Sequence, residues 1–391
     1  MRSNQFPTGN FLLVGLSAVL LLASMGCDSS GEKWRTIGNL GVETAGWESI
    51  ACHQGRLCLA FQDEKTNQVE VFQFKDSGWA PLGEGGLSNL GITSNVTLVV
   101  DSKDGSPYLA YEATRVSLLK ANKGLRPKPQ VSYQAFVQKL EGDIWKPIGQ
   151  GPVGEDLPTL GVSNGVVYLA HSDGGKVSVS RSLGKSWEKL GDRTLTEKGH
   201  PYTWRGIFVD PDSGYVYATI ENVDKKWSFV AKYDGKQWTR VGDNYVLGTL
   251  MADNGSLWVD HGNVYLAFHD VYRGGKATVV EYDGTQWKVL GKPGFSGGPA
   301  HYLSLVVYQG VPYLAYQDIL CGGKAMVMQF TAGSWEPLGG TEISHGGATF
   351  ESLALDDSTH KLYLAFKDLA YKGMPAVLEY SLDAPGRTVS N

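Results

Sequence analysis

The sequence is poor in cysteine and in charge. Only 4 of its 391 residues are cysteine, and Asp, Glu, Lys and Arg together make up 19 %. The formal net charge of −5 excludes the strongly basic character of a nucleic-acid-binding protein, so we expect no nucleic-acid partner. The composition instead indicates a folded body and not a disordered chain.

The chain also lacks the motifs of several common chemistries. It contains no phosphate-binding loop of the form GxxxxGK(S/T) and no CxxC pair. The loop histidines His200, His301 and His345 show no pair at metal-ligand spacing. The sequence therefore predicts no cofactor, no metal site and no catalytic residue, and it does not favour an enzyme.

The N-terminus has the pattern of an export signal. Phe11 to Ala23 is an apolar run of 13 residues, shorter than the roughly 20 that a membrane-spanning helix needs. Ser24 and Gly26 place small residues before Cys27, where a signal cleavage site requires them. The segment Ala23-Ser24-Met25-Gly26-Cys27 resembles a bacterial lipoprotein signal, which implies that Cys27 becomes the lipidated first residue.

This resemblance predicts a signal peptide over 1–26 and a short linker over 27–33. It also predicts a lipid anchor in a bacterial membrane, either inner or outer. Plain secretion, or release into the periplasm after the same cut, is the alternative.

A tryptophan motif repeats along the rest of the chain and predicts the architecture. The pattern Trp-x-x-(Ile/Leu/Val)-Gly occurs seven times, beginning at Trp34, Trp79, Trp145, Trp187, Trp238, Trp287 and Trp335. The matching glycines are Gly38, Gly83, Gly149, Gly191, Gly242, Gly291 and Gly339. Successive tryptophans are 45, 66, 42, 51, 49 and 48 residues apart, and a period near fifty is typical of repeat proteins.

A second repeated position lies in a β-like segment of every unit. Alignment on the tryptophans places an alanine there, which we call the ring alanine: Ala60, Ala110, Ala170, Ala218, Ala267, Ala315 and Ala365. Each unit contains four short runs rich in aromatic and β-branched residues, as strands are. In the clearest unit the runs are Ser256–Asp260, Val264–His269, Lys276–Tyr282 and Trp287–Leu290.

Four antiparallel strands repeated about a centre make a β-propeller, with strands named A to D from the centre outward. Trp34–Gly38 is a D strand with no earlier strands of its own unit, whereas the last unit ends without a tryptophan strand. The sequence thus predicts an all-β, seven-bladed propeller over 34–383, closed by the N-terminal strand pairing in the last blade. A tail follows over 384–391, and we expect a monomer.

The other cysteines suit a protein outside the cytoplasm. Cys52 and Cys58 flank a turn centred on Gly55, and we expect them to face each other across a hairpin and form a disulfide. Cys321 is left over as a free thiol in a loop.

Chain direction sorts the loops onto two faces. The A–B and C–D turns are mostly short and share one face, which we call the turn face. The B–C loops and the blade-to-blade D–A loops are longer and share the other, the loop face. Long loops on a rigid scaffold are where binding usually occurs, so we expect the binding site on the loop face.

Three sets of residues are predicted to gather on the loop face. The first is an aromatic residue at the start of strand A: Trp47, Trp204, Tyr302 and Phe350. The second is a carboxylate three residues after the ring alanine: Asp63, Asp173, Asp270, Asp318 and Asp368, with Glu221 in the fourth blade. The third is a basic loop in the insertion Thr114–Gln130: Arg115, Lys120, Lys123, Arg126 and Lys128.

Each set has a structural interpretation beside a functional one. The aromatic residues could pack between blades, or stack on sugar rings or on a partner's side chains. The carboxylates could cap loops through local hydrogen bonds, or bind sugar hydroxyls and cations. The basic loop could be solvated, or could dock an anionic partner or phospholipid headgroups.

Two resemblances bear on function. The chain after the signal resembles secreted bacterial proteins built from tryptophan-anchored propeller repeats, in segments such as Tyr265-Leu266-Ala267-Phe268. Ser180–Trp187 also resembles the Asp-box of sialidases and related propellers, although Ser182 stands where the box has aspartate. The Asp-box is a fold element, and propellers host lectins, scaffolds and enzymes alike.

We therefore expect a lipid-anchored, non-enzymatic binding or scaffold module outside the cytoplasm. Its expected partner is an envelope protein or a glycan, met by the loop face. A glycan-cleaving, sialidase-like hydrolase is the alternative, and it would need arginines such as Arg115, Arg193, Arg205 and Arg273 to reach the loop face.

Overall fold

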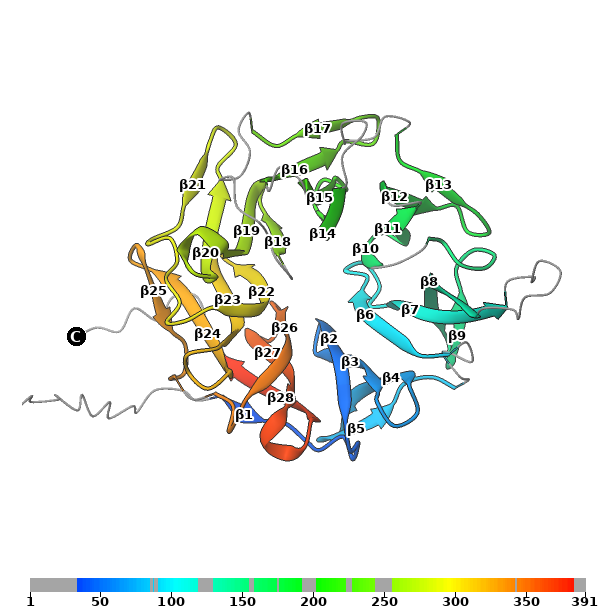
Figure 1. Cartoon of the computed structure of the whole chain (residues 1–391), viewed down its shortest axis with the longest axis horizontal. Helices are drawn as coiled ribbons and strands as arrows, with labels where there is room; N and C mark the ends of the chain where they lie inside the picture. The colour runs from blue at the N-terminus through cyan, green and yellow to red at the C-terminus, as the bar shows by residue number, and fades with distance from the viewer. Residues whose placement is uncertain are drawn as a thin grey trace, which may run out of the picture. The chain divides into compact units, whose positions relative to one another are not determined.

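Seven four-stranded antiparallel sheets stand in a ring, as Figure 1 shows. This computed structural model describes residues 34–84, 87, 91–118, 129–154, 158–173, 176–191, 202–222, 227–242, 255–341 and 343–382. The predicted all-β, seven-bladed propeller is confirmed. The predicted signal peptide, linker and C-terminal tail lie outside the described residues.

In the first six blades the four strands are consecutive in sequence. Blade one holds β2 (Ala45–His53), β3 (Arg56–Asp63), β4 (Gln68–Lys75) and β5 (Gly78–Pro81). Blade two holds β6 (Thr93–Val100), β7 (Pro107–Leu118), β8 (Pro129–Glu141) and β9 (Ile144–Pro147), and blade three β10 (Thr159–Ser163), β11 (Val166–Asp173), β12 (Lys176–Ser182) and β13 (Trp187–Lys189). Blade four holds β14 (Tyr202–Val209), β15 (Val216–Asn222), β16 (Trp227–Tyr233) and β17 (Trp238–Arg240). Blade five holds β18 (Ser256–Asp260), β19 (Asn263–Asp270), β20 (Lys276–Tyr282) and β21 (Trp287–Val289), and blade six β22 (Ala300–Tyr308), β23 (Val311–Asp318), β24 (Lys324–Thr331) and β25 (Ser334–Pro337).

Blade seven takes its outer strand from the other end of the chain. It consists of β26 (Ala348–Asp356), β27 (Lys361–Asp368), β28 (Met374–Ser381) and β1 (Arg35–Thr36). Arg35 lies opposite Glu379 in the pairing of β1 with β28, and its guanidinium donates a hydrogen bond to that carboxylate. The predicted closure of the ring by the N-terminal strand is therefore present.

The apolar core is divided among the spaces between neighbouring blades. One buried cluster, for example, joins Tyr217 and Val230 of blade four to Leu257 and Val264 of blade five. Two short 3-10 helices, η1 (Val271–Arg273) and η2 (Leu369–Tyr371), follow strands β19 and β27. In the described part of the chain, no helix has the length and apolar character needed to cross a membrane.

Every motif tryptophan is hydrogen-bonded to the blade before it. The indole Nε1 of Trp79 donates a hydrogen bond of 2.9 Å to the backbone carbonyl of Ile37. Ile37 is the residue just before the motif glycine Gly38. The other six bonds follow the same rule at 2.8 to 3.3 Å: Trp34 to Leu338, Trp145 to Leu82, Trp187 to Ile148, Trp238 to Leu190, Trp287 to Val241 and Trp335 to Leu290. Each copy of the motif is therefore hydrogen-bonded to the preceding copy, and this link is repeated around the whole ring.

The motif glycine is needed because the next indole lies against it. All seven motif glycines have positive φ, a conformation that glycine adopts readily. A Cβ at Gly339 would lie 2.6 Å from Cδ1 of Trp34, and one at Gly149 would lie 2.4 Å from Nε1 of Trp187. A side chain at this position would thus displace the tryptophan that links the blades.

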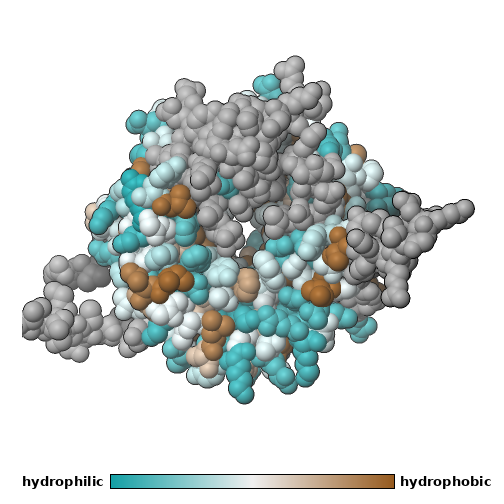
Figure 2. Space-filling view, in the orientation of Figure 1, coloured by the Kyte–Doolittle hydropathy of each residue, from teal (hydrophilic) through white to brown (hydrophobic). Residues whose placement is uncertain are grey.

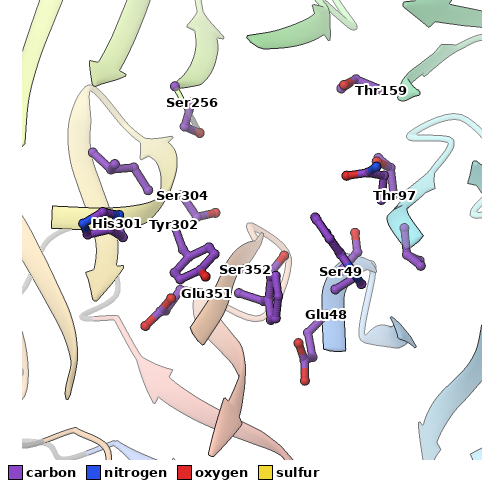
Figure 3. Close-up of a pocket in the computed structure, with 16 residues that line it drawn as sticks. Glu48, Ser49, Thr97, Thr159, Ser256, His301, Tyr302, Ser304, Glu351 and Ser352 are labelled. Atoms are coloured by element: carbon purple, nitrogen blue, oxygen red, sulfur yellow. The ribbon is translucent and has the colours of Figure 1, made fainter. Parts of the chain in front are cut away.

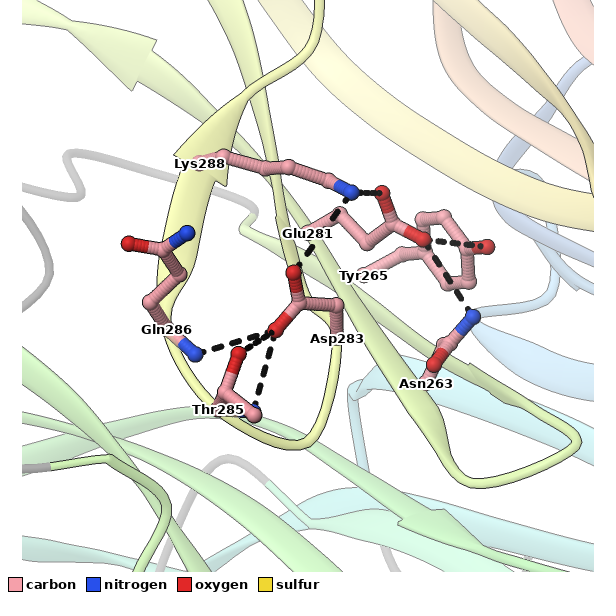
Figure 4. A network of polar contacts seen from close by, with 7 residues as sticks. All are labelled: Asn263, Tyr265, Glu281, Asp283, Thr285, Gln286 and Lys288. Carbon is pink, nitrogen blue, oxygen red and sulfur yellow. Dashed lines mark hydrogen bonds and ion pairs between the residues drawn. The ribbon is translucent and has the colours of Figure 1, made fainter.

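Local polar contacts fix the outer hairpin of blade five (Figure 4). Oδ1 of Asp283 accepts hydrogen bonds from the backbone amides of Thr285 and Gln286, each at 3.0 Å. The hydroxyl of Thr285, together with these amides, lowers the pKa of Asp283. Nζ of Lys288 lies 3.2 Å from Glu281 and 3.7 Å from Asp283, which ties strands β20 and β21 to their turn.

The ring alanine predicted for blade four was wrong. In the other blades the ring alanine pairs with a serine or threonine of strand A, as Ala60 does with Ser49. In blade four Thr219 pairs with Gly206, and Ala218 pairs one step along with Ile207. Thr219 therefore holds the ring position, and the position three residues later is Asn222 instead of Glu221. The larger threonine fits because its partner is glycine, where a Cβ would lie 3.3 Å from Oγ1 of Thr219.

The predicted disulfide is not formed, because the hairpin turn is one residue shorter than expected. Cys52 and Cys58 are free thiols, and exposed Cys321 is also free. His53 pairs with Arg56, so Cys52 lies opposite Leu57 and not opposite Cys58. A shift of one residue turns a side chain to the other face of the sheet. Accordingly, Cys58 packs in the cluster toward blade two and Cys52 packs against the cluster toward blade seven.

The insertion in blade two was predicted as a loop but is partly strand. Strand β7 continues to Leu118, which pairs with Pro129 at the start of β8. Arg115 therefore lies on a strand, opposite Ser132. The remaining basic residues of the predicted loop lie outside the described residues: Lys120, Lys123, Arg126 and Lys128. Figure 1 shows β7 and β8 reaching outward from the ring as a long hairpin.

We expect Gly339→Ala to destabilise the propeller more than Gly333→Ala. Both glycines have positive φ, which costs an alanine roughly 1 kcal/mol. Nothing lies within 4 Å of a Cβ at Gly333, whereas a Cβ at Gly339 meets Trp34. Moving that indole weakens its bond to Leu338, and we expect a further loss of about 2 kcal/mol. Urea unfolding of both variants measures the difference, and equal losses would contradict the contact as the reason for the glycine.

Candidate functional site

In five blades the pairing of strand A with strand B shifts register where strand A begins on the loop face, and in four of them the shift has the same form, a β-bulge. The pairing of strand A with strand B shifts register between Gly46 and Ser49, Ser94 and Thr97, His301 and Ser304, and Thr349 and Ser352. A bulge adds a residue to one strand and changes the direction of the side chains around it. The predicted aromatic position falls inside this bulge.

The bulge holds aromatic residues in a strained backbone conformation. Trp47, Tyr302 and Phe350 have φ values of 61°, 51° and 59°, and Asn95 has 48° at the same position of blade two. Asparagine tolerates positive φ, but for a bulky residue this conformation costs about 1 kcal/mol or more. Strain of this kind gathers at functional sites, so its repetition in three blades marks these aromatic residues as candidates.

Three of the four predicted aromatic residues form a continuous row across adjacent blades. The ring centroid of Phe350 lies 4.9 Å from that of Trp47 and 4.9 Å from that of Tyr302. We call these three residues the aromatic row. Trp204 occupies the corresponding register on β14, next to a register shift, but its side chain lies outside the described residues.

The aromatic row borders a cavity of about 690 Å³ at the centre of the ring. Small hydroxyl residues of six blades also line it: Ser49, Thr97, Thr159, Ser256, Ser304 and Ser352. Figure 3 shows these side chains placed around an open centre, with Tyr302 and His301 on the blade-six side. The cavity thus combines flat apolar rings with a circle of hydroxyl groups.

The hydroxyl groups also link neighbouring inner strands. Oγ of Ser49 accepts a hydrogen bond from the backbone amide of Leu98 in the next blade at 2.9 Å. The same bond recurs from Leu305 to Ser256, from Leu353 to Ser304 and from Ile50 to Ser352, at 2.9 to 3.1 Å. A hydroxyl that accepts one bond can still donate another, so these residues can hold the ring together and also contact a ligand.

Two buried glutamates complete the cavity, and the sequence analysis did not identify them. Glu48 and Glu351 are each 6 % exposed and line the cavity. They follow Trp47 and Phe350, so they occupy the same bulge position in two adjacent blades. None of their four carboxyl oxygens has a hydrogen-bond partner. Figure 3 shows both on the side of blades one and seven, with their carboxyl groups directed away from the open centre.

Burial dominates the electrostatics of both glutamates. It raises the pKa of Glu48 to about 8, and the backbone amide of Glu48 itself and then the nearby Lys367 offset only part of the rise. Burial also raises the pKa of Glu351, with a further contribution from Glu48. Nζ of Lys367 is itself paired at 2.5 Å with Glu64, whose carboxylate would lie 3.2 Å from a Cβ at Gly46. Burial therefore favours the protonated form of both carboxyls in the free protein.

The predicted carboxylates after the ring residue act as loop caps. Oδ1 of Asp270 accepts the amide of Tyr272 at the start of η1, and Oδ1 of Asp368 accepts that of Ala370 at the start of η2. The carboxylate of Asp318 accepts hydrogen bonds from the backbone amides of Leu320 and Gly298. The carboxylate of Asp63 accepts one from the backbone amide of Lys65. The side chain of Asp173 lies outside the described residues. In the four blades where this side chain is described, the carboxylate accepts hydrogen bonds from nearby backbone amides. None of these four carboxylates lines the cavity.

The loop histidines do not assemble a metal site in the described part of the chain. His269 and His301 lie 5.1 Å apart between ring centroids, and Nδ1 of His269 bonds the carbonyl of Ala300. His345 packs edge-on against Tyr371, and His200 lies outside the described residues. Across the described ranges, no group of three or more His, Cys, Asp or Glu side chains is placed to hold a metal ion.

We expect Glu48→Gln to raise the unfolding free energy at neutral pH. The pKa of Glu48 is higher in the folded chain, so the unfolded chain loses this proton above about pH 4.5 while the folded chain keeps it to about pH 8. Wild-type stability therefore falls as pH rises across this interval. Glutamine removes the dependence, which predicts a gain on the order of 2–3 kcal/mol near pH 7 and none near pH 4. Urea unfolding across pH measures this, and parallel profiles for the two proteins would contradict it.

Comparison with known proteins supports the fold alone. No family model matches the sequence, and no curated protein matches it. A protein of unknown function from Dyadobacter fermentans DSM 18053 has a similar structure, with a TM-score of 0.53 and 13 % identity over 90 % of this chain and 98 % of that one. Trypanosoma rangeli sialidase in complex with sialic acid gives 0.49 and 12 %, covering 90 % of this chain but 57 % of that one, and Hadza microbial sialidase Hz136 gives 0.48 and 13 %, covering 89 % and 68 %. This chain is a seven-bladed β-propeller, and its likeness to these solved structures is one of fold.

Proposed function

We propose that the protein is a non-enzymatic binding module that holds a glycan in the cavity at the centre of its loop face. The observation that carries this proposal is the aromatic row beside a circle of hydroxyl groups. Sugar rings present flat C–H faces and a rim of hydroxyls. Aromatic rings stack on the flat faces, and protein hydroxyl groups form hydrogen bonds with the sugar hydroxyls.

The dimensions of the cavity agree with a small ligand. Its volume of about 690 Å³ lies inside the range of roughly 300–1,000 Å³ typical of ligand pockets. Residues from six blades reach it, so the closed ring fixes their relative positions. The strained backbone at Trp47, Tyr302 and Phe350 holds the aromatic row in place before a ligand arrives.

The same geometry supports binding better than glycan cleavage. Glycoside hydrolysis commonly uses one protonated carboxyl and one ionised carboxylate across the scissile bond. Burial raises the pKa of both Glu48 and Glu351, which disfavours in each the ionised carboxylate that a nucleophile or base needs. A sialidase-like site also needs arginines, and none of the described residues that line the cavity is an arginine.

An envelope protein is the second candidate partner, because the loop face also carries exposed apolar side chains. They stand on the B–C loops of blades five, six and seven: Tyr272, Ile319, Leu320, Leu369 and Tyr371. Figure 2 shows small, separate apolar patches on a largely polar surface. Small, separate patches suit weak protein contacts, whereas the cavity offers a concave site.

The localisation of the module is proposed from the N-terminal signal. Cleavage before Cys27 and lipidation of that cysteine would anchor the propeller to a bacterial membrane, outside the cytoplasm. Glycans of the envelope are abundant in that compartment. The proposal therefore joins a lipid anchor, a rigid propeller and a glycan-binding cavity in one exported protein.

We expect Trp47→Ala and Phe350→Ala each to weaken glycan binding at least tenfold. Each change removes a stacking surface from the cavity, and a tenfold loss corresponds to about 1.4 kcal/mol. Tyr272→Ala is the matched control, because Tyr272 is 66 % exposed on η1 and does not line the cavity. A glycan array identifies the ligand, and titration calorimetry measures the affinities.

Circular dichroism establishes that each variant is folded before binding is compared. Equal binding by wild type, Trp47→Ala and Phe350→Ala would remove the aromatic row from the site. Failure of the wild-type protein to bind any glycan on the array would reject the proposed function and favour the protein partner.

A further inference from the structure

We propose that blade seven carries a second binding site, which takes an aromatic side chain of a partner protein. The site is a cavity of about 460 Å³ against the outer strands β28 and β1, and we call it the blade-seven pocket. Its lining includes the motif tryptophan Trp34 together with Ile343, Phe366 and Ala376. None of its described lining residues also lines the cavity at the centre of the ring, so the two sites can be filled independently.

The loops that enter blades six and seven have the same local structure. The hydroxyl of Ser296 accepts a hydrogen bond of 2.9 Å from a backbone amide of the preceding blade and donates one of 2.7 Å to the carbonyl two residues later. The hydroxyl of Ser344 makes the same two bonds at the same distances. Phe295 and Ile343, the residues just before these serines, therefore occupy equivalent positions.

In blade six this loop position is aromatic, and its ring covers the motif tryptophan. The ring centroid of Phe295 lies 4.5 Å from that of Trp335, with an angle of 8° between the planes, so the two rings are stacked. Phe295 also meets Tyr316 edge-on at 6.5 Å. Aromatic pairs of these kinds are more favourable than the buried area alone predicts. Blade six thus shows which chemistry fits over a motif tryptophan at this place.

Blade seven has smaller side chains at both positions that fill this space in blade six. Ile343 takes the place of the phenyl ring of the loop. Met326 lies opposite Tyr316 in blade six, and the same register position in blade seven, opposite Phe366, is Ala376. These two smaller side chains account for the blade-seven pocket. Apolar cavities of this kind bind aromatic rings.

A sugar ring fits the blade-seven pocket less well than an aromatic ring. Apolar side chains form much of its lining: Trp34, Ile343, Phe366, Met374, Ala376 and Leu378. Sugar hydroxyls placed against these side chains would lose their hydrogen bonds to water without replacement.

Exposed apolar side chains next to the pocket favour a protein as the partner. His345 and Tyr371 line the pocket, with their rings edge-on and the centroids 5.5 Å apart. Tyr371 and Leu369 lie on η2 and are exposed. A polypeptide that inserts an aromatic side chain can also cover these neighbours, whereas a free aromatic molecule would leave them in water. Aromatic side chains held in pockets commonly dominate the affinity of protein interfaces.

The first test measures binding of a blocked amino acid, N-acetyl-phenylalanine amide, by nuclear magnetic resonance. The reporter is the indole N–H signal of Trp34, which Trp34→Phe assigns. We expect the probe to shift this signal in a saturable manner. It should bind at least threefold more tightly than N-acetyl-leucine amide, because only the aromatic ring can stack on the indole.

The second test fills the pocket with the side chains that blade six has at the same positions. Ile343→Phe and Ala376→Met should each weaken binding of the phenylalanine probe at least tenfold. Neither change should lower the urea midpoint of unfolding, because each fills space that is already present. Ile319→Phe is the matched control, since Ile319 is 44 % exposed on blade six and does not line the pocket. Its affinity for the probe should equal that of wild type.

The possible results decide both the site and the kind of partner. Loss of binding in Ile343→Phe and Ala376→Met, with Ile319→Phe unaffected, supports the proposal. If one filling variant fails to fold, the other decides. No shift of the Trp34 signal, equal affinity for the leucine probe, or full binding by a folded filling variant would overturn the site. Binding of toluene without binding of the blocked amino acid would overturn the protein partner. Glycan binding at the centre of the ring should be the same in all these variants.

Discussion

The structure depends on one hydrogen bond that is repeated around the ring. Each motif tryptophan donates from its indole to the carbonyl just before the motif glycine of the preceding blade, as Trp79 does to Ile37. The glycine allows the contact because it adopts positive φ and leaves room for the indole. One short motif thus supplies the donor, the acceptor and the space. The inner strands add a second set of links, in which serine hydroxyls accept amides of the next blade.

The architecture could be predicted from the sequence because the repeat is long and its anchor residues are unusual. The number of blades follows from the tryptophan repeat. Closure of the ring follows from a first unit that has only strand D and a last unit that lacks it. The errors arose where a difference of one residue in turn length or pairing register decides which face of the sheet a side chain occupies. A two-residue turn instead of three placed Cys52 and Cys58 on opposite faces of β2 and β3. An alanine beside a threonine led to Ala218 being chosen over Thr219, because pairing register is not visible in a single strand.

The cavity was only half predictable for the same reason. The aromatic position was found because large rings recur in four blades, two residues before the small residue of strand A. Glu48 and Glu351 were missed because an inner-strand glutamate normally faces water, and the bulge that buries it has no clear signal in one repeat. Aligned repeats do carry a hint, since two neighbouring units place an acid directly after the aromatic residue. The predicted aspartates, by contrast, cap the loops that follow their strands, which is the role that a position at a strand end favours.

Closure by β1 also has a consequence for how the molecule forms. Trp34 bonds Leu338, a partner 304 residues away in sequence, so the earliest strand to be made is the last to find its place. Until then β28 presents an unpaired edge, which is a hazard for association with other chains. Contacts between distant parts of a chain slow folding. A protein that crosses a membrane unfolded before assembling its ring would meet this delay after transport, with both ends of the chain present at once.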